Sequence, residues 1–431
     1  MGEFLELISI KDAWDKLGEV LPWVKTGEGP GVRFPVEVPL LEAAGRILAM
    51  DLTSPEDVPS FDRSTVDGYA VRSRDTFGAS DAMPALLRVK GEVRMGHPCD
   101  FSLGSEEAAF IPTGGMLPPG ADAVVMVEDT DLLDRETVMV KAPVAPWENV
   151  VRRGEDIENG QRLLFKGQVL GPGHIGALAA LGIREVYVSR RPRVAIVSSG
   201  DEVVDVLQVP GPGQVRDINS CALAAAVSRL GGVPMNLGIV PDDPVRLEET
   251  LERALMGADM VILSGGSSIG ARDHAVAAIS SLGKPGILVH GLSVKPGKPT
   301  VIAVAGDKPV FGLPGHPLSC LVIFSQVVQP LIGAWMGMGS VENPVGIRMA
   351  SPWTGMKVSA IMGANIASAG GREDFISVRL VSREGELVAE PVLGKSAMIS
   401  VLAFADGMVR VPPEREGIRK GDNVEVTLFG P

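Results

Sequence analysis

The sequence predicts a multidomain protein of mixed α/β and β class, with a doubly wound α/β domain at its centre. Its 431 residues exceed what one hydrophobic core organises, so the chain should divide into roughly three or four domains. Strands and helices alternate from Arg193 to about Trp335, which is the pattern of a doubly wound sheet. Short β-like runs flank this region, and 52 Gly and 33 Pro imply many turns.

The same changes of pattern define four predicted domains. Residues 1–54 and 148–190 are expected to form one mixed α/β domain. Its N-terminal helices are too short to form a core alone and need a partner elsewhere in the chain, and this need for a partner surface also fits a dimer contact in that region. Residues 55–147 are expected to form a small β domain and residues 191–337 the α/β domain. Residues 338–431 are expected to form a C-terminal β-barrel domain.

The charge balance argues against two classes of partner. The 53 acidic and 40 basic side chains give a net charge of −13, which opposes attraction to nucleic acid or to an anionic membrane. Aromatic residues make up only 4% of the chain, so few rings are available to stack on bases. We therefore expect no nucleic acid and no membrane as partners.

The cysteines and the start of the chain favour a cytoplasmic protein. Cys99, Cys221 and Cys320 are far apart and odd in number, which fits neither a disulfide framework nor a zinc ribbon. The first six residues carry acids where a secretory signal would be basic. The longest apolar run, 318–338, is interrupted by Ser, Gln and Pro, so we expect a buried helix there and not a membrane span.

Two helices are predicted near the N-terminus. Ser9 and Asp12 form a capping-box pattern that leads into a helix through about Val24, with apolar residues at helical spacing. A Gly/Pro stretch at 26–31 should end that helix. A second helical segment is expected around residues 40–50.

The small β domain is predicted from short strands at 68–71, 85–93, 108–111, 123–127 and 138–141. Two of its loops are more polar than folding requires. One contains Asp67 and the other contains Thr113. Taken alone, each is better explained by turn chemistry, because Asp-Gly and Thr-Gly are common turn pairs.

The segment 171–176 matches the dinucleotide fingerprint G-x-G-x-x-G, and we reject that interpretation. Pro172 removes a backbone donor from the turn, and the helix after it is short. The next strand, 185–188, ends on Ser189 and not on the acid that binds ribose. A chance match in a Gly-rich chain explains the pattern better.

The α/β domain is predicted from strands at 194–197, 235–240, 260–263, 287–289, 300–304 and 310–312, and from helices at 219–230, 244–256, 274–282 and from Leu318 onward. The run 260–263 is apolar throughout, as in a strand that helices cover on both faces. Asp273 is expected to be the N-cap of the helix at 274–282.

The loop after that buried strand is the first candidate site. It is formed by Ser264, Gly265, Gly266, Ser267 and Ser268. Small side chains leave the backbone N–H groups accessible to an anion, and ligands of open α/β sheets bind at the carboxyl ends of strands. Taken alone, the loop is read equally well as a tight βα turn without a ligand. The Walker pattern is absent, because Ala-Arg follows Gly270.

Carboxylates follow three neighbouring strands of the predicted sheet. They are Asp201, Glu202, Asp242, Asp243 and Asp273. Right-handed crossovers bring all three connections to one edge, and clustered carboxylates with small neighbours suit Mg²⁺. Asp243 precedes Pro244 and fits an N-cap, which leaves Asp242 the freer acid.

Two basic turns should face these acids. Lys295 and Lys298 offer two ammonium groups on a Lys-Pro-Gly-Lys turn. The segment 312–317, Gly-Leu-Pro-Gly-His-Pro, lies before a helix N-terminus, which favours anions. Together the acids and the basic turns describe a site for Mg²⁺ with phosphate or another oxyanion.

The C-terminal region predicts a small β-barrel with no obvious chemistry. Strands are expected at 375–380 and 387–391, joined through the polar turn 383–386, and at 423–429.

Several motifs together resemble the bacterial and archaeal molybdopterin molybdenumtransferase family, which is related to the E domain of gephyrin. The resemblance spans the whole chain. It is carried by the motifs at 65–71, 112–114, 153–156, 199–202, 264–266 with Asp273, 295–299 and 312–315 with Pro317. It implies a central molybdopterin-binding domain, insertion of molybdate into adenylylated molybdopterin with Mg²⁺ and release of AMP, and an elongated homodimer.

The resemblance also implies roles for particular residues. The family's functional positions fall on Asp67, Thr113, Glu202, Asp242, Asp273, Pro314 and Pro317. Glu202, Asp242 and Asp273 are then the expected Mg²⁺ ligands, with Asp243 as the alternative to Asp242 in the alignment. Substrate contacts are expected from Ser264, Gly265, Gly266, Ser267, Lys295, Lys298 and Gly315. His316 replaces the family's usual Asn and Ser267 its usual Val, which leaves those two side-chain roles open.

The family also implies partners and alternatives. Its small β domain leans on the α/β domain of the second subunit, so a shared active site is expected, and the molybdopterin adenylyltransferase is a candidate partner. A tungstate-inserting paralogue stays open, because tungstate has nearly the size and charge of molybdate. A non-catalytic molybdopterin-binding scaffold also stays open, although the presence of every expected carboxylate argues against it.

Overall fold

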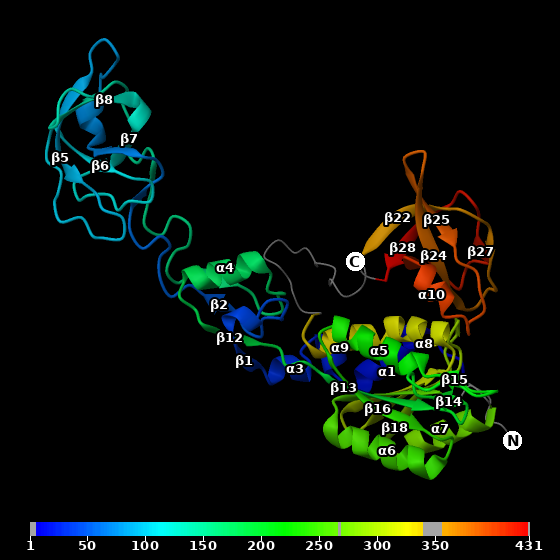
Figure 1. Ribbon diagram of the computed structural model, residues 1–431. Helices are drawn as coiled ribbons and strands as arrows, with labels where there is room; N and C mark the ends of the chain where they lie inside the picture. The colour runs from blue at the N-terminus through cyan, green and yellow to red at the C-terminus, as the bar shows by residue number, and fades with distance from the viewer. Residues whose placement is uncertain (1–5, 266–268, 339–355, 430–431) are drawn as a thin grey trace.

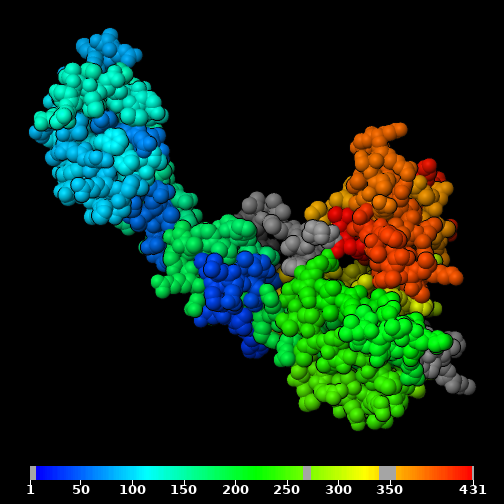
Figure 2. Space-filling model, viewed as in Figure 1, coloured from blue at the N-terminus to red at the C-terminus, as the bar shows by residue number. Residues whose placement is uncertain are grey.

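The computed structural model describes residues 6–265, 269–338 and 356–429, and the molecule is elongated. A small β sheet lies at one end, and the α/β sheet and the C-terminal barrel lie together at the other (Figure 1). A narrow segment that contains α4, β1, β2 and β12 joins the two ends (Figures 1 and 2).

The first helix begins where the sequence predicts and ends earlier. Helix α1 spans Ile10–Val20, and the predicted capping box is present, since Ser9 Oγ accepts from the Asp12 N–H at 3.1 Å. Pro22 lacks the N–H that would continue the helix. The chain then forms two single turns, α2 (Trp23–Thr26) and α3 (Pro30–Arg33).

The helix predicted around residues 40–50 is wrong. A short strand β1 (Val36–Pro39) runs into one 3₁₀ turn at Leu40–Glu42, and the chain then pairs with the 148–190 segment. Gly45 has a φ of +73°, a backbone conformation that would interrupt a helix. The β contacts of Ile47 and Leu48 therefore override the helical spacing of their neighbours.

Two strand pairs tie the N-terminal segment to residues 148–190. Strand β1 is antiparallel to β12 (Glu185–Val188), and β2 (Leu52–Thr53) is antiparallel to β11 (Arg162–Leu164). These pairs support the proposed joint domain. Helix α1 is different, because its buried Ala13 and Leu17 belong to the core of the α/β domain. Helix α1 therefore has its partner surface elsewhere in the same chain, as expected, and it gives no support for a subunit contact.

Helix α4 (Pro172–Ala180) supports the rejection of the dinucleotide fingerprint. It begins at Pro172, and the His174 ring accepts a hydrogen bond from the Gly171 N–H at 3.0 Å. The helix leads to β12, which pairs antiparallel with β1, so no parallel βαβ unit is formed.

The small β sheet confirms all five predicted strands and adds one. Its order is β7-β4-β6-β5-β9-β8. The strands are β4 (Gly68–Val71), β5 (Ala85–Glu92), β6 (Glu107–Ile111), β7 (Ala123–Met126), β8 (Thr130–Leu132) and β9 (Thr137–Val140). Next to the sheet, β3 (Arg63–Ser64) pairs with β10 (Val150–Val151).

The central sheet has the order β16-β13-β17-β21-β20-β18, and its first four strands are parallel. They are β13 (Arg193–Ser199), β16 (Val233–Val240), β17 (Met260–Gly265), β18 (Pro285–His290), β20 (Val301–Ala305) and β21 (Lys308–Pro314). Helix α5 (Ile218–Arg229) covers one face, and α6 (Pro244–Gly257) and α7 (Ile269–Ser281) cover the other (Figure 1). This is the predicted doubly wound domain.

The apolar segment after β21 packs beside α5. It forms α8 (Pro317–Ile323), a π-helical stretch (Phe324–Val328) and α9 (Gln329–Trp335). The continuous helix Pro317–Trp335 is long and apolar enough to cross a membrane by length and composition, but 72% of it is buried inside the protein. This burial matches the predicted core helix.

The C-terminal region forms the predicted barrel. The strands β24 (Glu373–Arg383), β25 (Glu386–Pro391), β22 (Lys357–Met362), β28 (Asn423–Leu428) and β26 (Gly407–Val411) pair in that order, and a β24–β26 pairing closes the ring. Two smaller strands, β23 (Ile366–Ala367) and β27 (Gly417–Ile418), and helix α10 (Ser400–Phe404) complete it. Strand β19 (Val294–Lys295), from the α/β domain, adds in parallel to β24.

Candidate functional site

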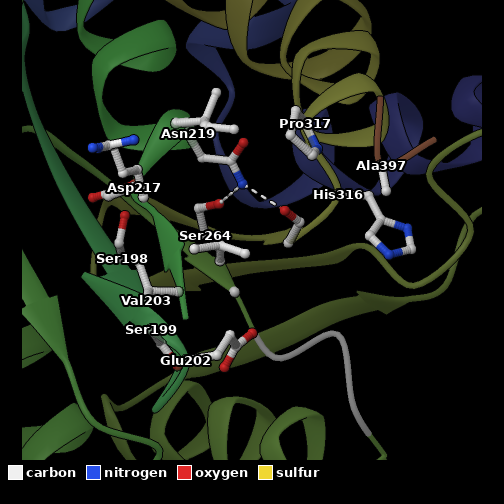
Figure 3. Close-up of a pocket in the computed structure, with 15 residues that line it drawn as sticks. Ser198, Ser199, Glu202, Val203, Asp217, Asn219, Ser264, His316, Pro317 and Ala397 are labelled. Carbon is white, nitrogen blue, oxygen red and sulfur yellow. Dashed lines mark hydrogen bonds between the residues drawn. The ribbon is translucent and has the colours of Figure 1, made fainter. Parts of the chain in front are cut away.

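A pocket of about 290 Å³ lies at the carboxyl ends of β13 and β17, as expected for an open α/β sheet. Strands β14 (Val203–Val204) and β15 (Val215–Arg216) and the N-terminal end of α5 form one side of it. Ser198 and Asp217 lie on one side of the pocket, and His316 and Ala397 lie on the other (Figure 3). The lining residues are Ser198, Ser199, Glu202, Val203, Val215, Arg216, Asp217, Ile218, Asn219, Ser264, Gly265, Gly315, His316, Pro317 and Ala397.

Ser198, which lines the pocket, carries a buried polar atom. Ser198 is 3% exposed, and its Oγ has no hydrogen-bond partner among the described residues. A buried polar atom without a partner costs free energy unless a ligand or water supplies one. Asp217 beside it is the N-cap of α5, with its Oδ1 accepting from the Ser220 N–H at 3.0 Å.

Asn219 fixes the ends of two strands, and the sequence did not identify it. Its Nδ2 donates to Ser264 Oγ and to the Gly315 carbonyl, each at 2.8 Å (Figure 3). It therefore joins the ends of β17 and β21 at the pocket. The available signal was its position at the start of a helix that follows a polar Arg-Asp pair, and this reads equally well as ordinary capping.

Predicted carboxylates lie together at this sheet edge, and each makes different contacts. Glu202 lines the pocket, and Asp242 accepts from Ser199 Oγ at 2.5 Å. Asp243 accepts from the Arg246 N–H at 2.9 Å as the N-cap of α6, which confirms its structural use. Asp201 accepts from the Asp242 N–H at 3.2 Å.

The expected N-cap role of Asp273 is wrong. Helix α7 begins at Ile269, so Asp273 lies within its second turn, and its side chain is exposed. The neighbouring His274 bonds through Nδ1 to the Asp242 carbonyl at 2.8 Å, which brings this part of α7 to the carboxylate edge. Apolar spacing could not show that the helix starts within the glycine-containing loop.

The three expected Mg²⁺ ligands are not arranged as a three-residue metal site. Across residues 6–265, 269–338 and 356–429, no group of three or more His, Cys, Asp or Glu side chains could hold a metal ion. Glu202, Asp242 and Asp273 still offer the oxygen donors that Mg²⁺ prefers. A site that uses one or two carboxylates together with substrate phosphates needs no such protein cage.

The strand-end loops supply backbone groups to the pocket. Gly265 ends β17 and is paired with Pro314, the last residue of β21. Gly315 and Pro317 line the pocket, whereas Pro314 is buried next to them. Gly266 and Ser267 lie outside the described residues.

Ser264 lies at the floor of the pocket beside a buried thiol. Its Oγ is 3.8 Å from Cys320 Sγ. Burial raises the pKa of the Cys320 thiol to about 12, so this cysteine is neutral and unsuited to act as a nucleophile.

The two lysines of the Lys-Pro-Gly-Lys turn do not line this pocket. Lys295 and Lys298 are exposed, and Lys295 belongs to β19, opposite Asp374 of β24. The sequence analysis assigned the turn to the α/β domain, and it did not reveal that Lys295 pairs with the barrel sheet.

Asp67 and Thr113 meet each other at the far end of the molecule. Asp67 Oδ1 accepts from the Thr113 N–H at 2.7 Å and from Thr113 Oγ1 at 2.9 Å. The backbone bond, followed by the hydroxyl bond, lowers the pKa of Asp67. These residues flank β4 and β6 of the small sheet, which lies far from the α/β domain in the same chain (Figure 1).

The barrel also contributes to the pocket, which the sequence did not indicate. Ala397 lines the pocket, and Ser396 Oγ is 2.9 Å from His316 Nδ1. The segment that carries both residues follows β25 and has no motif of its own.

Comparisons with known proteins agree with this architecture. The family model described as MoeA N-terminal region (domain I and II) matches residues 8–182, and the probable molybdopterin binding domain matches 195–334. The MoeA C-terminal region (domain IV) matches 359–429.

Similar proteins match nearly the whole chain. A molybdopterin molybdenumtransferase of Haemophilus influenzae is 33% identical over 98% of this chain and 99% of its own. A putative molybdopterin biosynthesis protein of Methanocaldococcus jannaschii is 34% identical over 91% and 92%. The crystal structure of a molybdopterin biosynthesis MoeA protein from Pyrococcus horikoshii is 38% identical, covers 99% of this chain and 100% of its own, and has a TM-score of 0.83. The chain therefore belongs to the molybdopterin molybdenumtransferase family.

Proposed function

We propose that this protein inserts molybdate into adenylylated molybdopterin and releases AMP, as a cytoplasmic enzyme of molybdenum cofactor biosynthesis. The observation that carries the proposal is a pocket at the strand ends of the matched molybdopterin-binding domain. Glu202, Ser264, Gly265, Gly315 and Pro317, which the family pattern singles out, line this pocket.

Different walls of the pocket suit different parts of the substrate. The polar inner wall with Ser198 Oγ and Asp217 suits the hydrogen-bonding edge of a ring. The loops at Gly265 and Gly315 suit close approach of phosphate or dithiolene groups to the backbone. Asn219 holds these two loops at a fixed separation, so the pocket is organised before the substrate binds.

The carboxylate edge is where Mg²⁺ fits best. Glu202 faces the pocket, and Ser199 connects Asp242 to the same strand end, so these two acids are the ones we assign to the ion, with Asp273 nearby on α7. A bound Mg²⁺ would neutralise charge on the phosphates of the substrate. The Ser199 hydrogen bond orients the Asp242 carboxylate.

Asp67 and Thr113 need a second subunit if they act at this pocket. In one chain the small sheet and the pocket lie at opposite ends (Figure 1). A dimer in which the small β domain of one subunit approaches the pocket of the other would unite them. Exposed apolar side chains on the intervening segment, Phe34 at 68% and Leu41 at 86% exposure, support a subunit contact there. The molybdopterin adenylyltransferase, which makes the substrate, is the protein partner that fits this chemistry.

The direct test is incubation of the purified protein with adenylylated molybdopterin, Mg²⁺ and either molybdate or tungstate. We expect AMP release and metal bound to the pterin, with both absent when Mg²⁺ is omitted. Asp273→Asn is expected to abolish AMP release and leave Tm nearly unchanged, because the side chain is exposed. Binding of the pterin without AMP release by the wild type would instead indicate a scaffold.

A further inference from the structure

The C-terminal barrel holds one wall of the pocket through a short segment between β25 and α10. Within it, the Ser396 carbonyl accepts from the Leu318 N–H at 3.2 Å, and Ser396 Oγ is 2.9 Å from His316 Nδ1. Ala397 then lines the pocket beside His316 (Figure 3). The segment therefore contacts both the loop that ends β21 and the start of α8.

The barrel is anchored to the α/β domain independently of this segment. Strand β19 pairs with β24, and the Glu373 N–H donates to the Ser293 carbonyl at 3.0 Å. Ser293 Oγ donates to the Gly371 carbonyl at 2.8 Å. The Ser396 side chain can therefore be removed without detaching the barrel, so its effect on the pocket can be measured by itself.

The contact with Ser396 determines which atom of His316 faces a ligand. Nδ1 is occupied by Ser396 Oγ, and within the described residues Nε2 has no partner. The ring is exposed at the pocket, on the side opposite Ser198 and Asp217 (Figure 3). In this 2.9 Å contact either the hydroxyl or the ring can donate. A serine hydroxyl that donates to Nδ1 leaves the proton on Nε2, and an imidazolium also has a proton there. An anionic ligand at Nε2 favours these two forms over the tautomer that donates from Nδ1.

Charges on the two sides of the pocket differ. Asp217, Glu202 and the cationic Arg216 line the remaining walls, whereas the segment beside His316 carries the exposed Lys395. The lining residues next to His316 are Gly315, Pro317 and Ala397, so an anionic group at this wall has no carboxylate as its immediate neighbour. A phosphate or an oxyanion at this wall would meet the Nε2–H of His316.

We propose that Ser396 is a positioning residue, which holds His316 so that its Nε2–H donates to an anionic oxygen of the bound substrate. The inference rests on the proposed function and adds a specific contact to it. It also gives the barrel a direct part in substrate binding.

Two substitutions at His316 separate the two ring nitrogens. An Asn amide lies near the place of Nδ1, so His316→Asn can keep the contact with Ser396 but loses the donor to the ligand. A Gln amide reaches the place of Nε2, so His316→Gln can keep that donor but loses the contact with Ser396. We expect His316→Asn to weaken ligand binding about tenfold and His316→Gln to weaken it less.

Ser396→Ala should raise KM for adenylylated molybdopterin several-fold with kcat and Tm unchanged, and Ser396→Thr should restore it. The effect should vanish in the His316→Asn background, because no Nε2 remains to be positioned. Ser382→Ala, an exposed serine on β24 of the same barrel, is the matched control. Calorimetric titrations with AMP and with molybdate, done separately, show whether the phosphate or the oxyanion makes the contact.

Equal affinities of His316→Asn and His316→Gln for both AMP and molybdate would overturn the inference. It would also be overturned if Ser396→Ala raised KM in the His316→Asn background by as much as it does in the wild type. Either result, with an active wild type, leaves the proposed function in place. A wild-type protein that releases no AMP would refute the proposed function instead, and the contact proposed for His316 would fall with it.

Discussion

Asn219 is a single side chain on which the pocket geometry depends. It is 8% exposed, and its amide bonds to Ser264 Oγ and to the Gly315 carbonyl. Ser264 lies in β17 and Gly315 directly follows β21, and these two strands pair in parallel. A change at this position therefore alters the separation of two loops, in addition to the two hydrogen bonds.

Replacing Asn219 with Ala should destabilise the protein by roughly 1–3 kcal/mol for each buried group left unpaired, and should also raise KM. Asn219→Asp keeps the shape but turns a carboxylate oxygen toward the Gly315 carbonyl, so we expect at least as large a loss of activity. Urea unfolding and steady-state kinetics measure the two effects. Asn159→Ala, at an exposed site outside the pocket, is a suitable control. Unchanged stability and KM for Asn219→Ala would show that the loops are held by other contacts.

Glu107 provides a pH-dependent contribution to the small β domain. Its Oε2 accepts from the Gly104 N–H at 2.8 Å and from Lys90 Nζ at 2.9 Å, and its Oε1 pairs with Arg88. These contacts, the Gly104 backbone bond first, lower the pKa of Glu107 to about 2. The charged form therefore favours the folded state above the unfolded pKa of 4.5, and this contribution is lost as the pH falls toward 2.

We therefore expect Glu107→Gln to lower the stability of the protein at pH 7, and the difference from the wild type to shrink between pH 4.5 and pH 2. Thermal unfolding over that pH range measures it. A difference that persists unchanged at low pH would mean that Glu107 acts through packing and not through its charge.

At the scale of elements, β17 shows why a glycine must end the central strand. Gly265 has a φ of +150°, and a Cβ there would lie 2.2 Å from the Ser199 carbonyl oxygen of β13. The close approach of these two strand ends shapes the floor of the pocket. A side chain at this position would push the backbones apart.

Gly265→Ala should destabilise the protein by roughly 3 kcal/mol and abolish substrate binding, since backbone atoms must move. Gly283→Ala is the matched comparison, because Gly283 has a φ of +114° but no atom within 4 Å of the added Cβ. Only conformational strain of roughly 1–2 kcal/mol is then expected. Circular dichroism melts compare the two variants, and equal losses would show that strain alone explains both.

Strand positions were predictable because burial on both faces leaves continuous apolar runs. The runs at 260–263 and 68–71 fall within β17 and β4. Helix starts were predictable where a cap is local, as at Ser9 and Asp243. The type of secondary structure was not predictable where tertiary contacts decide it. In residues 40–50, β bridges to Val169 and Val188 override the helical spacing of the apolar residues.

The site was predictable only in part, for a similar reason. The carboxylates follow strand ends, and strand order in a doubly wound sheet brings them to one edge. Asn219 and Ser396 have their roles through contacts with residues 45 to 96 positions away in the sequence. Ser198 is notable because its Oγ has no hydrogen-bond partner in the part of the chain that the structure describes. No local sequence pattern encodes either feature. The family resemblance identified the positions of Asp67 and Thr113, whereas their distance from the pocket emerged only from the fold.

At the scale of the whole molecule, the most informative feature is the separation of Asp67 and Thr113 from the pocket of the same chain (Figure 1). The small β domain has its own core and meets the rest of the chain through a narrow segment (Figure 2). In the proposed dimer, this domain would approach the pocket of the other subunit. Within it, Asp67 accepts two hydrogen bonds from Thr113, so the geometry of this pair is set within one chain.

We accordingly predict that Asp67 acts in trans, and mixed dimers test this. Asp67→Ala and Asp242→Ala should each be inactive as homodimers. A mixed dimer of the two has one site with both wild-type residues and one site with neither, so activity should return to about half that of the wild-type dimer. Differently tagged subunits allow the mixed species to be purified, and the AMP release assay measures the activity. Mixed dimers that stay inactive beside an active, identically tagged wild type would mean that Asp67 serves its own subunit or only its turn.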